Sequence, residues 1–512
     1  MKQTYTLIYL ALLLSMHMHA EQEQPTNTHV QQEQHQPIVD LREALDTDYA
    51  FFNDPYLQAE LQPLHDLTQV GLGPKGIIKK EEAPEGAHEP IVDPSEAFDV
   101  DFSYFNDPYA FEKFRKLPIK AIFSGYVQHS AWWDSRQVVG LVEDYILFFP
   151  KKRVFDVDCN DINSRGQFNM TMVETRIRGE LYGPKVLGAN TFAYIETDFI
   201  GDAVFINRLR VRNAFLQMTW EKATILMGQF WSPMFIIKTF PLTVAFDGGV
   251  PIELFARSPQ VRITANVGNT ELVFAALSQL DFVSNGPIGF STTYLRNARI
   301  PELIARIAHQ REHVYAGAGV SFLRLKPRLE SNKGFKVREY INSVRCVLFG
   351  TVKFEPLEIR SSFSYSENGT NLAGISGYAV ATVNPTTDER TYTNTRAISS
   401  WLDINVNKRI EPGIFIGVTK NLGAGRQIIP CVYNPKTDED EHTIYTLFGD
   451  AEQLDTVFEV TPRIRFHVLP VDFAFEYRYI RAGFGCIDQR ARPHNIDPVS
   501  DNRILFTAYY YF

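Results

Sequence analysis

Hydrophobic and polar side chains alternate along most of the chain from residue 119 to the C-terminus. The alternation is clearest in 457–468 and 471–481. In 471–481, one face carries Val471, Phe473, Phe475, Tyr477 and Tyr479, and the other carries Asp472, Ala474, Glu476 and Arg478. A period of two is typical of β-strands with one apolar and one polar face. The pattern therefore predicts an all-β region over residues 119–512.

The spacing of the candidate strands indicates which kind of β protein this is. Sixteen strands are expected, at 119–130, 167–181, 189–200, 205–218, 222–231, 259–267, 270–280, 301–309, 313–325, 340–354, 357–367, 396–408, 412–421, 455–468, 471–482 and 503–512. Long connections (131–166, 232–258, 281–300, 326–339, 368–395, 422–454, 483–502) mostly alternate with short turns. The connection 201–204 is the exception, because it is short where a long one is expected. Such spacing predicts a 16-stranded antiparallel transmembrane β-barrel with short periplasmic turns and long outer loops.

Both ends of the chain support export to an outer membrane. Residues 1–20 combine Lys2, an apolar stretch from Thr6 to Ser15 and the small residue Ala20, which predicts a signal peptide. Beyond it, no apolar run is long enough for a transmembrane helix. The last strand ends at Phe512 and has an apolar face. It resembles the signal that outer-membrane proteins present to the barrel-assembly machinery.

Residues 21–118 form an acidic extension with a duplicated motif. They contain 7 Lys+Arg and 20 Asp+Glu, within a chain of net charge −9. The motif PIVD…FNDPY occurs in 36–56 and again in 89–109. We expect a mostly irregular extension in the periplasm. The repeats are interpreted as docking motifs for a periplasmic partner, as a weak Ca²⁺ site, or as a duplicated spacer.

Several arginines occupy strand positions whose side chains would face the lumen of the predicted barrel. The candidate pore-lining residues are Arg176, Arg178, Arg208, Arg210, Arg212, Arg463, Arg465 and Arg478. Unpaired arginines in a water-filled pore would favour anions. Alternatively, the arginines pair with carboxylates such as Glu174, Glu180, Glu459 and Glu476 and simply fill the wall. The sequence leaves both readings open.

The long connection 232–259 is too apolar to lie in water. We expect it to fold into the lumen and narrow it, with Lys238, Asp247, Glu253 and Arg257 near the constriction. The alternative is that it packs against a neighbouring subunit.

Four segments resemble DcaP-like porins of the phosphate-selective porin superfamily. They are GELYGPKVLGANTFAYIETDFIG (179–201), NRLRVRNAFLQM (207–218), LMGQFWSP (226–233) and IPELIARI (300–307). The resemblance covers roughly 165–325. It implies a homotrimeric 16-stranded barrel in outer-membrane lipid that passes small hydrophilic, often anionic, solutes. The extension departs from the family, because it is Pro-rich and has no coiled-coil heptads.

Two functions other than that of a porin also fit parts of the sequence. One alternative is a non-conducting structural or surface-interaction protein of the outer membrane. A second is a barrel hydrolase, for which His129, Ser130 and Asp134 are the nearest candidates. The HQREH sequence at 309–313 matches a zinc-protease pattern but falls at a predicted turn between strands. We therefore expect no catalytic residues, metal, cofactor or nucleic acid partner.

The four cysteines form no C-x-x-C pair. Cys431 and Cys486 are expected on neighbouring outer loops, and in an oxidising compartment they are candidates for a disulfide.

Overall fold

The computed structural model describes residues 119–201 and 206–512. The predicted signal peptide (1–20), the acidic extension (21–118) and its repeats (36–56 and 89–109) lie outside these residues. In the described part of the chain, no helix is long and apolar enough to cross a membrane.

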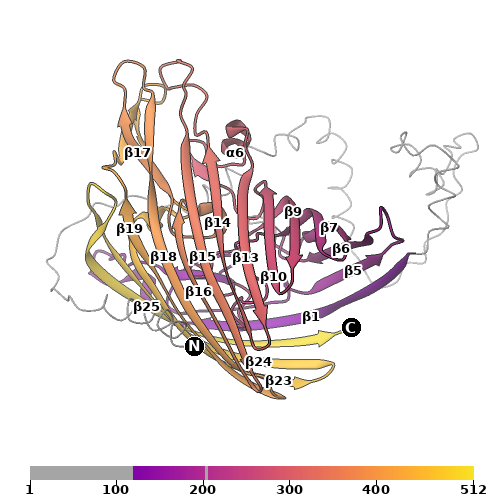
Figure 1. The fold of residues 1–512 in the computed structure, drawn as a ribbon. Helices are drawn as coiled ribbons and strands as arrows, with labels where there is room; N and C mark the ends of the chain where they lie inside the picture. Colours follow the sequence, from indigo (N-terminus) through magenta and orange to yellow (C-terminus); the bar gives the residue numbers. More distant parts are fainter. Residues whose placement is uncertain (1–118, 202–205) are drawn as a thin grey trace, which may run out of the picture. The chain divides into compact units, whose positions relative to one another are not determined.

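The described residues form a closed 16-stranded antiparallel barrel, which confirms the predicted fold class (Figure 1). Its strands are β1 (Lys120–Asp134), β4 (Gln167–Thr171) continued by β5 (Arg176–Tyr182), β6 (Asn190–Asp198), β7 (Arg210–Thr219), β8 (Ala223–Trp231), β9 (Arg257–Val267), β10 (Thr270–Leu277), β13 (Glu302–Arg311), β14 (Val314–Leu325), β15 (Ile341–Phe354), β16 (Leu357–Glu367), β18 (Arg390–Val406), β19 (Ile410–Ala424), β23 (Leu454–Val468), β24 (Val471–Ile487) and β25 (Pro493–Tyr511). Each predicted strand corresponds to one position in the barrel.

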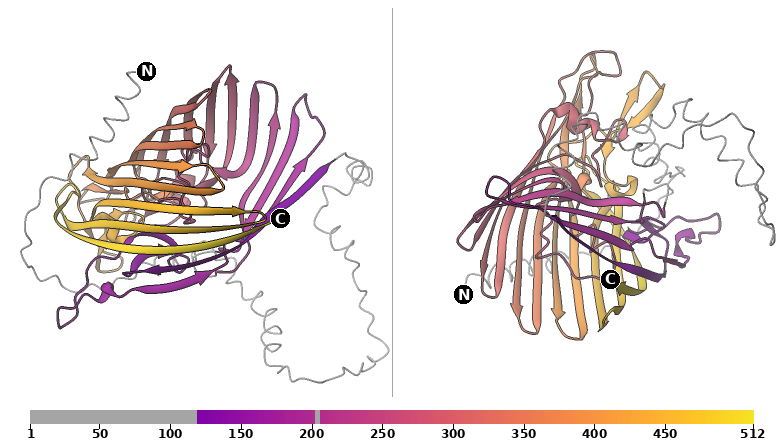
Figure 2. Two further views of the ribbon diagram at one scale, coloured as in Figure 1. Left: turned by 90° about the horizontal axis from the view of Figure 1, so that it is seen from below. Right: turned by 90° about the vertical axis from the view of Figure 1, so that its right-hand side faces the viewer.

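Closure joins the two ends of the barrel sequence. β1 pairs with β25 from Tyr126 opposite Tyr511 to Asp134 opposite Arg503, and with β4 on its other edge. In Figure 2 the last strands (yellow) accordingly lie beside the first (indigo). Closure satisfies the backbone groups that an edge strand would leave unpaired, as a structure in a bilayer requires.

Successive side chains along each strand face alternately the outside and the inside of the barrel. On β9, Val261 and Ile263 point outward and are 51% and 49% exposed, whereas the inward neighbour Gln260 is 5% exposed. Exposed apolar side chains recur around the outside, including Phe274, Ile307 and Phe475. An apolar outer surface with a polar interior is the pattern of a barrel solvated by lipid.

The connections define two ends of the barrel. Short turns such as 268–269 and 469–470 lie at the end where β1 starts and β25 finishes, here called the turn end; the opposite end is the loop end. Two connections differ most from prediction. The connection between β6 and β7 spans 199–209 instead of 201–204, and the segment 483–502 is mostly strand, leaving 488–492 as the loop. Strands that extend beyond the lipid need no apolar face, so alternation does not mark where they end.

Smaller elements occupy the long connections. These are β2 (Val138–Leu141), β3 (Ile146–Pro150), η3 (Ile162–Ser164), β11 (Asn285–Gly286), β12 (Gly289–Phe290), α6 (Thr293–Ala298), η4 (Thr370–Leu372), β17 (Tyr378–Val383), β20 (Cys431–Asn434), β21 (Glu439–His442), β22 (Ile444–Tyr445) and η5 (Gly449–Glu452).

At the loop end, an ion-pair network ties three connections together, and we call it the rim network. Arg328 contacts Glu339 at 2.6 Å and Asp388 at 2.8 Å, while Arg390 contacts Glu441 at 2.9 Å. Burial by itself raises the pKa of Asp388. Hydrogen bonds from Arg328 and from the backbone of Asn332, and the charge of Arg328, lower the pKa by more, so it lies below its ordinary value. The outer loops are therefore held in a folded arrangement.

Candidate functional site in the barrel lumen

The predicted pore arginines on β5 and β7 are paired with carboxylates. Arg176 lies 3.0 Å from Glu174, and Arg178 lies 3.1 Å from Glu196. Arg210 and Arg212 both contact Asp198, at 2.8 and 2.7 Å. The side chain of Arg178 is 33% exposed and that of Arg210 26%, whereas Arg212 is 2% exposed. This cluster is a charge network with one face open to solvent.

On β23 and β24 the arginines are buried more deeply. Arg463 contacts Asp403 at 2.7 Å, and Arg478 contacts Asp247 at 2.6 Å and Glu459 at 2.7 Å. Both arginine side chains are at most 1% exposed. Arg465 donates hydrogen bonds to the backbone carbonyls of Leu242 and Thr243. These three arginines hold internal structure together.

Arg208 differs from its predicted position in a strand. β7 begins at Arg210, so Arg208 lies in the preceding connection and is exposed. The alternation of Arg208, Arg210 and Arg212 continued past the end of the strand, and parity alone could not reveal that end.

The predicted constriction loop lies inside the barrel and contacts inward-facing wall residues. Glu476 of β24 accepts hydrogen bonds from the backbone N–H groups of Val244 and Ala245, at 2.5 and 3.2 Å. Arg360 of β16 donates to the carbonyl of Phe240, and Thr351 of β15 donates to that of Lys238. The apolar side chains of the loop are thereby removed from water.

The four predicted site residues of the constriction loop have different roles. Asp247 is fully buried against Arg478, and Arg257, at the start of β9, pairs with Asp281 at 2.6 Å. Glu253 is buried and accepts a hydrogen bond from the indole of Trp401. Burial raises the pKa of Glu253 from 4.5 to about 8, against the opposing effect of this hydrogen bond. Lys238 is exposed, with its ammonium group 4.7 Å from the centre of the Tyr315 ring.

A second segment folds into the lumen and was not predicted. The first long connection contains the hairpin β2–β3, whose residues Ile146–Pro150 are all buried. Phe148 and Phe149 pack with apolar residues of the constriction loop, of other loops and of β18 and β23–β25 in one cluster, here called the lumen core: Val138, Val139, Ile146, Leu147, Phe148, Phe149, Phe235, Val250, Phe255, Phe290, Ala373, Ile375, Ala397, Leu447, Phe448, Ala451, Leu454, Val457, Ile480, Ala482, Phe484 and Val499. The uninterrupted apolar run Ile146–Phe149 within an outer loop was the available signal.

Polar contacts fix this hairpin to the wall and to the constriction loop. The backbone N–H of Leu147 donates to Asp247 at 3.1 Å. Arg503 of β25 donates to the carbonyl of Asp144 at 2.7 Å, and the Tyr145 hydroxyl donates to Glu174 at 2.7 Å. Apolar burial and buried hydrogen bonds together give the hairpin one position.

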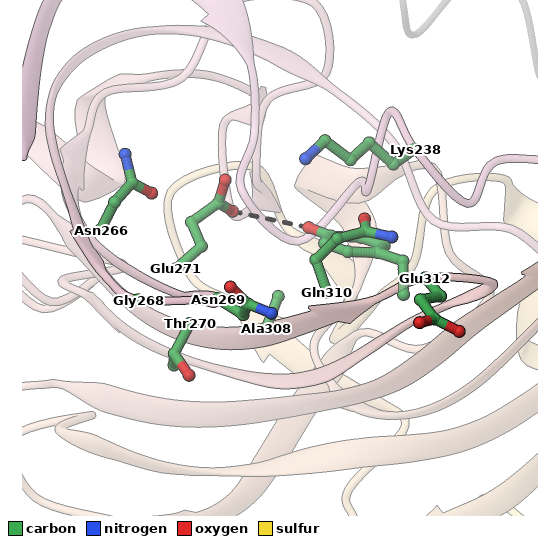
Figure 3. Close-up of a pocket in the computed structure, with 10 residues that line it drawn as sticks. Lys238, Asn266, Gly268, Asn269, Thr270, Glu271, Ala308, Gln310 and Glu312 are labelled. Atoms are coloured by element: carbon green, nitrogen blue, oxygen red, sulfur yellow. Dashed lines mark hydrogen bonds between the residues drawn. The ribbon is translucent and has the colours of Figure 1, made fainter.

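A polar cavity opens at the turn end, between β9, β10, β13 and the constriction loop (Figure 3). It has a volume of about 420 Å³. Its lining residues are Lys238, Asn266, Gly268, Asn269, Thr270, Glu271, Ala308, Gln310, Glu312 and Tyr315. Glu271 pairs with Arg306 at 2.6 Å, beneath the cavity wall. The lining offers one ammonium group, two carboxylates and several amides to a solute.

Arg262 is a lumen arginine that the prediction left out of its pore-lining set. It lies on the same face of β9 as Asn266 and is half-buried. Its guanidinium donates to the side chain of Gln260 at 2.8 Å and to the carbonyl of Trp231, and it stacks over the Phe230 ring. Among the described residues it contacts no carboxylate at ion-pair distance. It therefore keeps a positive charge that no ion pair offsets.

Cys431 and Cys486 lie in β20 and β24 near the loop end, and both are exposed. The structure has no disulfide between them, so the predicted bond gains no support from it.

The enzymatic alternatives find no assembled site. His129 is exposed on the outward face of β1, whereas Ser130 and Asp134 are buried on the inward face, where Asp134 pairs with Arg503 at 2.6 Å. His309 and His313 lie on either side of the β13–β14 turn. Within 119–201 and 206–512, no group of three or more His, Cys, Asp or Glu could hold a metal ion.

Comparison with known proteins gives similarity in fold. No family model matches the chain, and no curated protein matches it. The outer membrane channel DcaP of Acinetobacter baumannii is 18% identical, with a TM-score of 0.54 over 77% of this chain and 97% of that one. OmpT of Vibrio cholerae is 11% identical, with a TM-score of 0.46 over 77% and 98%. The anion-selective porin from Comamonas acidovorans is 7% identical, with a TM-score of 0.45 over 77% and 100%. The similarity to DcaP shows that the barrel has the fold of an outer-membrane channel.

Proposed function

We propose that the protein is an outer-membrane porin for passive diffusion of small hydrophilic solutes, with a preference for anions. The observation that carries this is the polar cavity at the turn end, inside a barrel whose outer face is apolar. Lys238 lines it, Arg262 lies on the same face of β9 as the lining residue Asn266, and the lining carboxylate Glu271 is paired with Arg306. A net positive field in a narrow passage raises the local concentration of anions.

We further propose that the protein is a DcaP-like porin of the phosphate-selective porin superfamily. Two findings support this proposal: the four similar sequence segments and the similarity in fold to DcaP. Membership implies a homotrimer. For residues 1–20 and 21–118 we propose a cleaved signal peptide and a periplasmic extension, in which the repeats 36–56 and 89–109 are candidates for docking a periplasmic partner.

The test is planar-bilayer conductance of the purified mature protein under a KCl gradient. We expect stable steps in groups of three and a reversal potential on the anion-selective side. Folded protein, recognised by its heat-modifiable mobility in electrophoresis, that never conducts would contradict the channel function.

The lumen core favours a second candidate function, a non-conducting surface-interaction protein. A buried apolar cluster within a barrel blocks water wherever it spans the lumen. Absence of conductance in wild-type protein, with conductance restored by removing the hairpin β2–β3, would support this candidate.

A further inference from the structure

The walls of the lumen are covered to different extents. Along β23–β25, inward side chains toward the turn end, such as Ala474, Glu476 and Leu505, are buried beneath Tyr145 of the hairpin turn and the constriction loop. Inward side chains on β5–β9 stay partly exposed toward the turn end: Arg178, Glu180, Tyr194, Gln217, Thr224, Arg262, Thr264 and Asn266. Water therefore reaches the second wall more readily than the first.

From this difference we propose that the hairpin β2–β3 is a second constriction element, which confines the solute path to the β5–β9 wall. The proposal rests on the porin function proposed above. It makes the first outer loop a determinant of pore size, in addition to the constriction loop.

The proposal assigns the charge selectivity to particular side chains. On the covered wall, Arg463 and Arg478 face buried carboxylates and present no charge to a passing ion. On the open wall, Arg262 has only neutral acceptors, and Lys238 stands across the cavity at the turn end. Arg178 is partly exposed, but Glu196 offsets its charge. Arg262 and Lys238 are therefore the residues that set anion preference.

The first experiment measures reversal potentials in a KCl gradient for R262Q, K238Q and the control K353Q. Lys353 is also a cation near the turn end, but it lies on β15, outside the β5–β9 wall, and its charge is offset by Glu358 at 3.1 Å. We expect the anion-to-cation permeability ratio to fall at least about twofold in R262Q and K238Q. R262K should retain the wild-type ratio, and K353Q should leave it unchanged.

The second experiment replaces residues 138–150 with a short Gly-Ser linker. Removing the hairpin should raise single-channel conductance several-fold, with heat-modifiable mobility showing that the barrel is folded. If wild-type protein conducts but the linker variant has the same conductance, or R262Q and K353Q behave alike, the path assignment is wrong while the porin function stands. If wild-type protein does not conduct, the porin function itself fails.

Discussion

The β5–β9 wall and the β23–β25 wall carry the same residue types at the same strand parity but use them differently. Arg178 is one-third exposed beside Glu196, whereas Arg478 is 1% exposed between Asp247 and Glu459. The first is partly open to solvent, and the second lies beneath two inserted loops. The same residue type at the same strand parity thus stays in contact with water or becomes part of the interior, depending on what covers it.

The largest expected effect on stability comes from a comparison of R478A with R178A. Removing Arg478 leaves Asp247 and Glu459 buried without their partner, which costs about 3–5 kcal/mol. Removing Arg178 leaves the buried Glu196 with Arg176, Arg212 and Asn213 as partners, so we expect a loss of at most about 1 kcal/mol. The measurement is urea unfolding of the folded barrel in detergent. Equal losses in the two variants would show that the inserted loops do not bury Arg478 as described.

A second test concerns the packing of the inserted hairpin. Phe148 is fully buried in the lumen core, so F148A should cost about 3–5 kcal/mol of local stability. The loosened hairpin should also make channel conductance larger and noisier. Phe155 in the same connection is 55% exposed, so F155A serves as the control with little effect. Quiet, wild-type conductance in F148A would argue against a packed hairpin.

The smallest expected effect is a pH dependence from Glu253. Its pKa in the folded protein lies at about 8, above the ordinary 4.5. The folded state therefore holds a proton that the unfolded state releases, and stability falls as pH rises through this range. We expect E253Q to flatten the dependence of unfolding on pH between about pH 5 and about pH 9, whereas E312Q, at an exposed turn, should not. An unchanged slope in E253Q would place Glu253 in contact with water.

Much of the fold could be predicted because successive side chains of a strand face two different surroundings, lipid on one side and the barrel interior on the other. A side chain such as Val261 meets lipid and its neighbour Gln260 meets the interior, so strand positions and parity follow from the sequence. Strand ends at the loop end could not be read, because alternation there continues past a strand end or stops before it. The alternating arginines suggested a strand at Arg208, although β7 begins only at Arg210.

The site was harder to predict than the barrel. Partners such as Asp403 for Arg463 or Asp247 for Arg478 are distant in sequence and depend on how strands and loops meet. Loop length suggested that the first connection lies outside, yet its run Ile146–Phe149 is buried. Apolarity in a loop was the better guide in both cases, because the apolar segment between β8 and β9 also lies inside the barrel.

The rim network makes the loop end of the barrel a preformed surface for a binding partner. Arg328, Glu339, Asp388, Arg390 and Glu441 join segments far apart in sequence into one ordered surface. An antibody or phage fibre that binds there would pay little conformational entropy to order the loops. Its epitope would be discontinuous, present on the folded barrel and lost when heating separates those segments.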